Sequence, residues 1–192
     1  MLAASGITAA SALNRTSGSY GSSTPTYTGA ITGHENSGAD VTAAQVSLVN
    51  VVTAINSLPA DATSLPAAVG GVITITPGVY KLDATVIADS LIFSGGPGST
   101  FYIVSSSTIT LGSVPSVSLA GGVQEQGIFW LANSGFSTAG SSPPDLFGTV
   151  IAQSSASFAN GLTLHGAVYA QTGAVTFGGT PAVVTGPVNS CA

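Results

Sequence analysis

The side chains that could support acid–base chemistry are few and scattered. Asp83 and Asp89 fall in one region, whereas Glu125 and Asp145 each stand alone near a turn. A solenoid enzyme that cleaves polysaccharides needs at least a pair of titrating groups within reach of one bond. We interpret all four as solubilising or turn residues, and we predict that the protein is not an enzyme. A lyase or hydrolase would require Asp83, Asp89 and Asp145 to converge in a groove.

Metal and cofactor chemistry has equally little support. His34 and His165 are far apart in the sequence, and no Cys/His/Asp spacing indicates a metal site. Gly95–Gly98 lacks the Lys-Ser/Thr context of a phosphate-binding loop and is interpreted as a turn. The single cysteine, Cys191, has no internal disulfide partner and is interpreted as an end residue. We therefore expect no metal and no cofactor.

Charged residues are scarce in this chain of 192 residues. Only 5% of them are charged, against about one quarter in an ordinary domain, so hydroxyl groups must keep the surface hydrated. The chain has only two Lys+Arg residues and a formal net charge of -5, which argues against binding of nucleic acid. No apolar run approaches the roughly 20 residues of a membrane span. The composition favours a secreted, extracellular, β-rich protein, and we expect it to be a monomer.

The first residues contain no recognisable signal peptide, because Met1–Ala4 has neither a basic region nor a full apolar region. A mature, trimmed or recombinant start at Met1 is expected. Secretion is inferred from composition alone.

A repeat with a period near 20 residues organises the second half of the chain. Leu146–Gln153 aligns with Leu164–Gln171 at an offset of 18, and Ile128–Leu131 precedes Thr149–Ala152 by 21. Short β-type segments that recur at such a period predict a solenoid, in which each coil buries its alternate apolar residues against the next. No linker divides the chain, so residues 1–192 are expected to form one domain.

One amphipathic helix is predicted from Val41 to Leu58. Asp40 is expected to cap its N-terminus, and Pro59 to end it. Its length of about 27 Å matches five or six coils at about 4.8 Å each, which favours a strut along one flank of the solenoid. The apolar residues recur at helical spacing and predict one buried stripe: Val41, Ala44, Leu48, Val51, Val52, Ile55 and Leu58.

Small and hydroxyl-bearing residues are predicted to stack on one face of the solenoid. Side chains alternate along a strand, so Ile109 and Leu111 should point inward and leave Thr108 and Thr110 outside. The same rule turns Phe136, Ala156, Phe158, Val175 and Phe177 inward. Because these segments follow equivalent strands, their outward residues should form one ladder: Thr108, Thr110, Gly135, Ser137, Ser155, Ser157, Ala174 and Thr176. Thr172 is a further candidate for this ladder.

The order of several motifs resembles the microbial ice-binding (antifreeze) protein family. After the amphipathic helix come Ile75-Thr76-Pro77-Gly78-Val79-Tyr80, then Gly127-Ile128-Phe129-Trp130, then the two coil ends Ala152-Gln153 and Ala170-Gln171. The likeness covers nearly the whole chain. It departs from the family pattern where Thr32–Glu35 replaces Gly-Val-Ser-Pro, and where the segment that caps the solenoid in some members is short or missing.

The resemblance implies a mainly β fold: a discontinuous β-solenoid of triangular cross-section with one long α-helix packed alongside. It also implies a secreted protein that binds the surface of an ice crystal through one flat face, without a cofactor. The predicted ladder is then the candidate ice-binding face. Thr suits such a face, because its methyl excludes water while its hydroxyl anchors a neighbouring water molecule.

An extracellular adhesin-like or carbohydrate-binding solenoid without catalysis is the alternative. Sugar sites favour exposed aromatic platforms, for which Tyr20 and Tyr27 are the candidates, whereas Trp130 is expected to be buried. His165 takes the place of Phe147 in the repeat, so we expect a partly buried, structural role for it.

Overall fold

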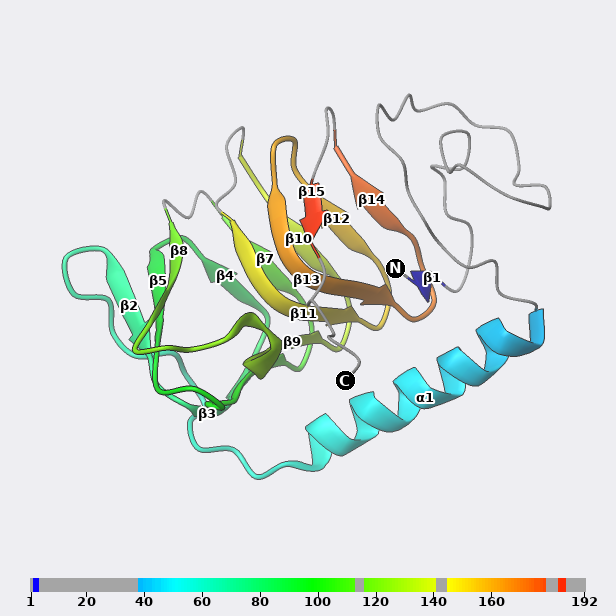
Figure 1. The fold of residues 1–192 in the computed structure, drawn as a ribbon, viewed down its shortest axis with the longest axis horizontal. Coiled ribbons are helices and arrows are strands. Elements are labelled where there is room, and N and C mark those ends of the chain that lie inside the picture. The colour runs from blue at the N-terminus through cyan, green and yellow to red at the C-terminus, as the bar shows by residue number, and fades with distance from the viewer. Residues whose placement is uncertain (1, 4–37, 113–115, 141–144, 179–182, 186–192) are drawn as a thin grey trace.

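The chain forms a stack of β-coils with one long helix along its side (Figure 1). The computed structural model describes residues 2–3, 38–112, 116–140, 145–178 and 183–185. Tyr20, Tyr27, His34, the Thr32–Glu35 segment and Cys191 lie outside these residues. The elements, in chain order, are β1 (Leu2–Ala3), α1 (Gly38–Ser57), β2 (Val72–Ile75), β3 (Gly78–Leu82), β4 (Thr85–Ile87), β5 (Ser90–Ser94), β6 (Phe101–Ser105), β7 (Ile109–Leu111), β8 (Val117–Ala120), the short 3-10 helix η2 (Glu125–Gly127), β9 (Ile128–Ala132), β10 (Phe136–Thr138), β11 (Leu146–Ala152), β12 (Ala156–Phe158), β13 (Thr163–Ala170), β14 (Val175–Phe177) and β15 (Val183–Thr185).

Three parallel sheets make up the sides of the solenoid. Sheet I is seven-stranded, with the order β1-β13-β11-β9-β6-β3 and with β15 also paired to β13. Sheet II is five-stranded, with the order β14-β12-β10-β7-β4, and sheet III contains β2, β5 and β8. The first coils pass through all three sheets, whereas the described coils after β8 pass only through sheets I and II. The predicted β-solenoid is confirmed.

The solenoid is discontinuous, as expected from the family resemblance. β1, near the N-terminus, pairs with β13, which lies far along the chain. Helix α1 then runs from that end of the stack to the opposite end, where β2 and β3 begin the continuous coils (Figure 1). The helix therefore spans the stack, and its 20 residues correspond to about 30 Å.

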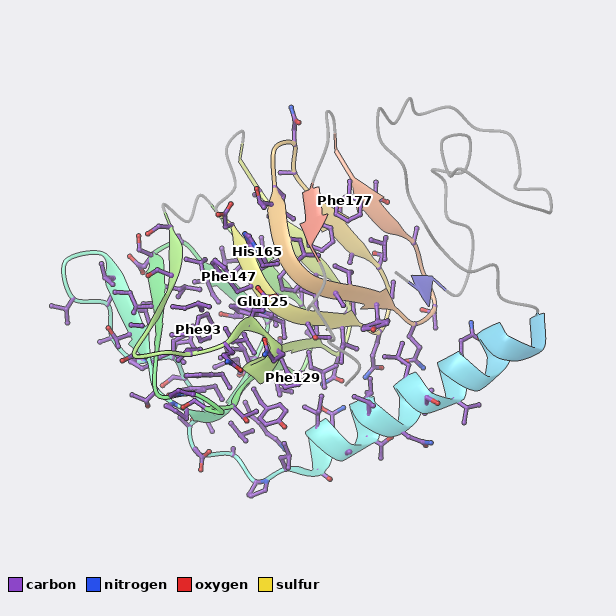
Figure 2. All side chains as sticks on the ribbon, viewed as in Figure 1. Phe93, Glu125, Phe129, Phe147, His165 and Phe177 are labelled. Atoms are coloured by element: carbon purple, nitrogen blue, oxygen red, sulfur yellow. The ribbon has the colours of Figure 1, made fainter. Side chains whose placement is uncertain are left out.

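The interior is filled by the inward residues of all three sheets, with a row of aromatic rings along its length. Trp130 is fully buried, as predicted, and contacts Phe93 and Phe136 edge-on at ring distances of 5.6 and 6.2 Å. Its indole nitrogen donates a 2.9 Å hydrogen bond to the carbonyl of Phe147, so the one polar atom of the ring is satisfied. Figure 2 shows Phe93 inside the wide end of the solenoid.

Glycines in the repeat are required by close contact between coils. Gly148 and Gly166 both have positive φ, at 101° and 147°, and a Cβ at either position would meet the carbonyl oxygen of the coil before it, from Ile128 and Gly148 respectively. Only glycine tolerates both the positive φ and the close carbonyl oxygen, so both copies of the repeat have glycine at this position.

Helix α1 begins earlier than predicted. It starts at Gly38, so Asp40 lies within the first turn and the expected N-cap assignment is wrong. A carboxylate is favoured both at an N-cap and inside the first turn, where the helix dipole attracts negative charge, and the sequence does not separate the two positions. The helix ends at Ser57, one residue before the expected Leu58.

The buried stripe of α1 is narrower than predicted. Leu48, Val52 and Ile55 pack against Val104, Leu131 and Ile151, which stand in register on the outside of sheet I. Val51 is 44% exposed and Leu58 is half-buried, because the contact with a flat sheet needs only the residues at i, i+4 and i+7. The side chains of Val41 and Ala44 lie outside the described part of the helix. Sheet I is therefore the face that the helix covers.

None of the described helices is long and apolar enough to cross a membrane.

Candidate functional site

The candidate acidic residues do not form one site. Asp83 and Asp89 line a shallow cavity of about 320 Å³ between β4 and the Thr63–Leu65 segment, and Asp145 is not part of its lining. Asp145 instead lies beside His165. Within the described residues, no group of three or more His, Cys, Asp or Glu side chains is placed to hold a metal ion. The groove that a polysaccharide-cleaving enzyme would need is thus not assembled from these carboxylates.

His165 has the partly buried, structural position that the repeat predicts. Its ring stacks on Phe147 of the preceding coil at 4.7 Å with an interplanar angle of 12°, and the two lie side by side in Figure 2. Its Nε2 is 3.7 Å from Oδ2 of Asp145, and 29% of its side chain is exposed. These contacts tie β11 to β13 on the outside of sheet I.

The predicted hydroxyl ladder exists as a geometric feature of sheet II. Thr110 pairs in register with Ser137, Ser137 with Ser157, and Ser157 with Thr176. All four side chains point outward, since their neighbours in the same strands are buried or packed against the core. The hydroxyls of Thr110 and Ser137 are 3.1 Å apart and hydrogen-bonded. We call this row the central column.

A second outward row, the leading column, precedes the central one by two residues in each strand. Successive coils are joined there by backbone hydrogen bonds: Ile109 N to Gly135 O at 3.1 Å, Phe136 N to Ser155 O at 3.0 Å, and Ala156 N to Ala174 O at 3.0 Å. The expected residues therefore stack, and the column continues to Ala84: Ala84, Thr108, Gly135, Ser155 and Ala174.

A third outward row, the trailing column, was not predicted from the sequence. It follows the central column by two residues and contains only Ala and Gly: Ala88, Gly112, Ala139, Ala159 and Gly178. Backbone hydrogen bonds continue the sheet at these positions, including Gly112 N to Ile87 O and Ala139 N to Leu111 O, both at 2.8 Å. Extending the alternation rule by two residues past each expected segment would have found this column.

Thr172 lies at a corner of the coil and not in a column. β11 and β13 pair at an offset of 18 residues, whereas β12 and β14 pair at an offset of 19, so the last corner holds one extra residue. The hydroxyl of Thr172 donates a 2.8 Å hydrogen bond to the carbonyl of Gln153. That bond anchors the longer corner to the coil before it.

Amide side chains fix the corner between sheets I and II. Asn56, near the end of α1, donates to Oδ1 of Asn133 at 2.9 Å, and Gln153 donates to the same oxygen. Asn133 in turn donates to the carbonyl of Ser105 at 3.0 Å. Three coils and the helix are thus joined immediately before the strands of sheet II begin, which holds those strands level with one another.

The outward face of sheet II is regular and uncharged. None of the residues in the three columns is ionisable. Strands in a sheet are about 4.8 Å apart, and alternate residues along a parallel strand are about 6.6 Å apart, so the columns form a nearly rectangular net. Helix α1 packs on sheet I and not on this net (Figure 1). A shallow cavity adjoins this face at its β4 edge, where Ala84 and Ala88 belong to the lining; the rest of the net fits another flat, periodic surface.

The fold and the flat net define the class of this chain as a discontinuous β-solenoid with one flanking helix. The chain belongs to the family described as ice-binding-like, whose model matches residues 1–182. It is 32% identical over 120 residues to an ice-binding protein of Colwellia sp, an alignment that covers 62% of this chain and 47% of that protein.

Solved structures share the fold. An ice-binding protein domain of Shewanella frigidimarina superposes with a TM-score of 0.65 at 23% identity, covering 78% of this chain and 64% of that one. An ice-binding protein from the Antarctic ascomycete Antarctomyces psychrotrophicus gives a TM-score of 0.60 at 26% identity, covering 77% and 71%. This chain therefore spans about half the length of its curated relative and just under two thirds of the Shewanella domain.

Proposed function

We propose that the protein is an ice-binding (antifreeze) protein that adsorbs to ice through the outward face of sheet II. One observation carries the proposal: three in-register columns of small, uncharged residues cover the only five-stranded sheet in the described structure, and the helix packs on a different sheet. Membership of the ice-binding-like family supports the same function.

The chemistry of the columns suits an ordered layer of water. Charged groups would hold water in their own hydration geometry, whereas methyl groups exclude it and single hydroxyls anchor it. In the central column, Thr110 and Ser137 already share one hydrogen bond, so the spacing of the coils places hydroxyls at hydrogen-bonding distance from each other. Water held between columns at a fixed spacing can then join an ice surface with little rearrangement.

Adsorption of this kind accounts for antifreeze activity without any catalytic step or cofactor. Molecules fixed on an ice surface pin the growth front between them, which depresses the freezing point below the melting point and suppresses recrystallisation. We further propose that the protein acts outside the cell as a monomer, because ice forms there and because a second copy on sheet II would cover the face that binds ice.

Observation of a single ice crystal tests this function. In a dilute solution of the protein, the crystal is expected to become faceted and to stop growing within a gap between its melting and freezing points. A crystal that grows round and unhindered at concentrations where the protein is folded, as measured by circular dichroism, would contradict the proposal.

A further inference from the structure

The strand β4 lies at one edge of sheet II and extends the three columns by one more row. Val86 pairs in register with Thr110, which places it at the end of the central column. Thr85 N donates a 3.0 Å hydrogen bond to Thr108 O, which places Ala84 beside Thr108 in the leading column. Gly112 N donates to Ile87 O at 2.8 Å and places Ala88 beside Gly112 in the trailing column. The row on β4 is therefore built like the others but carries no hydroxyl.

Val86 is unusually exposed for an apolar residue. Its relative exposure is 71%, while its neighbour Thr85 is half-buried. Placing Thr85 outward and Val86 inward would satisfy the ordinary preference of both side chains, yet the register with β7 turns them the other way. Valine and threonine have nearly the same shape, so Val86 keeps the profile of the central column and replaces the hydroxyl with a methyl.

The charged residues near β4 lie at the corners of the coil and not within the columns. Asp83 precedes Ala84, and Asp89 follows Ala88. Ser106 donates a hydrogen bond of 3.4 Å to Oδ1 of Asp83, so this carboxylate contacts the corner of the next coil. The row Ala84, Val86 and Ala88 thus continues the net up to a boundary marked by two carboxylates, where the same row lines the shallow cavity beside Thr63–Leu65.

We infer that Val86 contacts ice and that the ice-binding face extends over all five strands of sheet II to β4. This inference rests on the proposed function of that sheet. It assigns an exposed apolar residue to the binding surface and means that a row can bind ice through methyl groups alone. Every other row of the central column carries a hydroxyl, from Thr110, Ser137, Ser157 or Thr176.

The substitution Val86→Lys tests the inference, with Val46→Lys as its matched control. Val46 is also an exposed valine, at 57%, but it lies on α1. The Val86→Lys variant should show at least a two-fold lower thermal hysteresis than the wild type at equal concentration, because an ammonium group keeps its own hydration shell at the end of the face. The Val46→Lys variant should match the wild type.

The outcomes separate the inference from the proposed function. Equal hysteresis for Val86→Lys and the wild type would end the face at β7 and overturn the inference, while leaving ice binding by the wild type intact. A wild type that does not bind ice would overturn both. Should Val86→Lys melt at a lower temperature, Val86→Gln replaces it, and the same two-fold criterion decides.

Discussion

A tyrosine at Ser157 should block the proposed face without disturbing the fold. Ser157 is exposed in the middle of β12, and its neighbours in the central column are Ser137 and Thr176. The phenol ring would project well beyond the surrounding serine, alanine and glycine side chains. It would therefore hold the adjacent rows away from a flat ice surface.

The size of the effect follows from the dimensions of the net. Five strands and three columns span about 19 by 13 Å, or about 250 Å². At about 25 cal/mol per Å² for apolar surface, full contact would contribute up to about 6 kcal/mol. About half of the outward groups are hydroxyls or bare backbone, so we expect Ser157→Tyr to lose about 3 kcal/mol of binding free energy. This corresponds to roughly a 100-fold loss of affinity for ice.

Stability should change far less than affinity. A substitution on an exposed surface typically alters the free energy of unfolding by less than about 0.5 kcal/mol, which shifts the Tm of a chain of this size by about 1–2 °C. The same change at Ser118 is the matched control, because Ser118 is an exposed serine within β8 of sheet III.

Partition of the protein into a growing ice hemisphere measures the loss directly. Ser157→Tyr should be excluded from the ice, while Ser118→Tyr should enter it like the wild type, with all three melting within about 2 °C of each other. Equal partition of the two variants would refute the assignment of the face. So would loss of partition in Ser118→Tyr alone, which would point to sheet III.

Three further predictions concern the scaffold and its independence from charge. Replacing Leu131 with Ala removes a fully buried side chain beneath α1; it should cost about 3 kcal/mol and lower the Tm by about 6–12 °C in a thermal melt, while hysteresis near 0 °C persists. Gly148→Ala combines a positive φ with a clash against the carbonyl of Ile128, so it should destabilise the fold by at least about 2 kcal/mol in a urea titration; a wild-type midpoint would contradict the close contact. Hysteresis should stay constant from about pH 5 to about pH 8, the range in which histidine titrates, because no column residue is ionisable; a hysteresis that changes across this range would contradict binding through the three columns alone.

Much of the fold was predictable because the repeat and its physical cause are both visible in the sequence. Two copies aligned at an offset of 18 residues imply that the same residues stack in space, and β11 and β13 pair at that offset. The alternation of inward and outward residues then placed Thr110, Ser137, Ser157 and Thr176 in one column, as the structure shows. Their contact with ice stays a prediction.

The missed features are those that depend on neighbours in space. Thr85 and Val86 have the wrong polarity for their orientations, so only pairing with β7 reveals which one faces outward. The trailing column of Ala and Gly lies beyond the last apolar residue of each expected segment, and only the backbone hydrogen bonds between coils show that the strand pairing continues there. The exposure of Val51 depends on the flatness of sheet I beneath α1, which periodicity alone does not describe.

Transfer of proton polarisation from ice to the protein in frozen solution tests the central claim most directly. In solid-state NMR of methyl-labelled protein, the signals of Thr110 and Thr176 on sheet II should gain polarisation from ice protons before those of Val46 and Val49, which are exposed on α1. Faster transfer to the two valines, or equal transfer to all four residues, would contradict binding through sheet II.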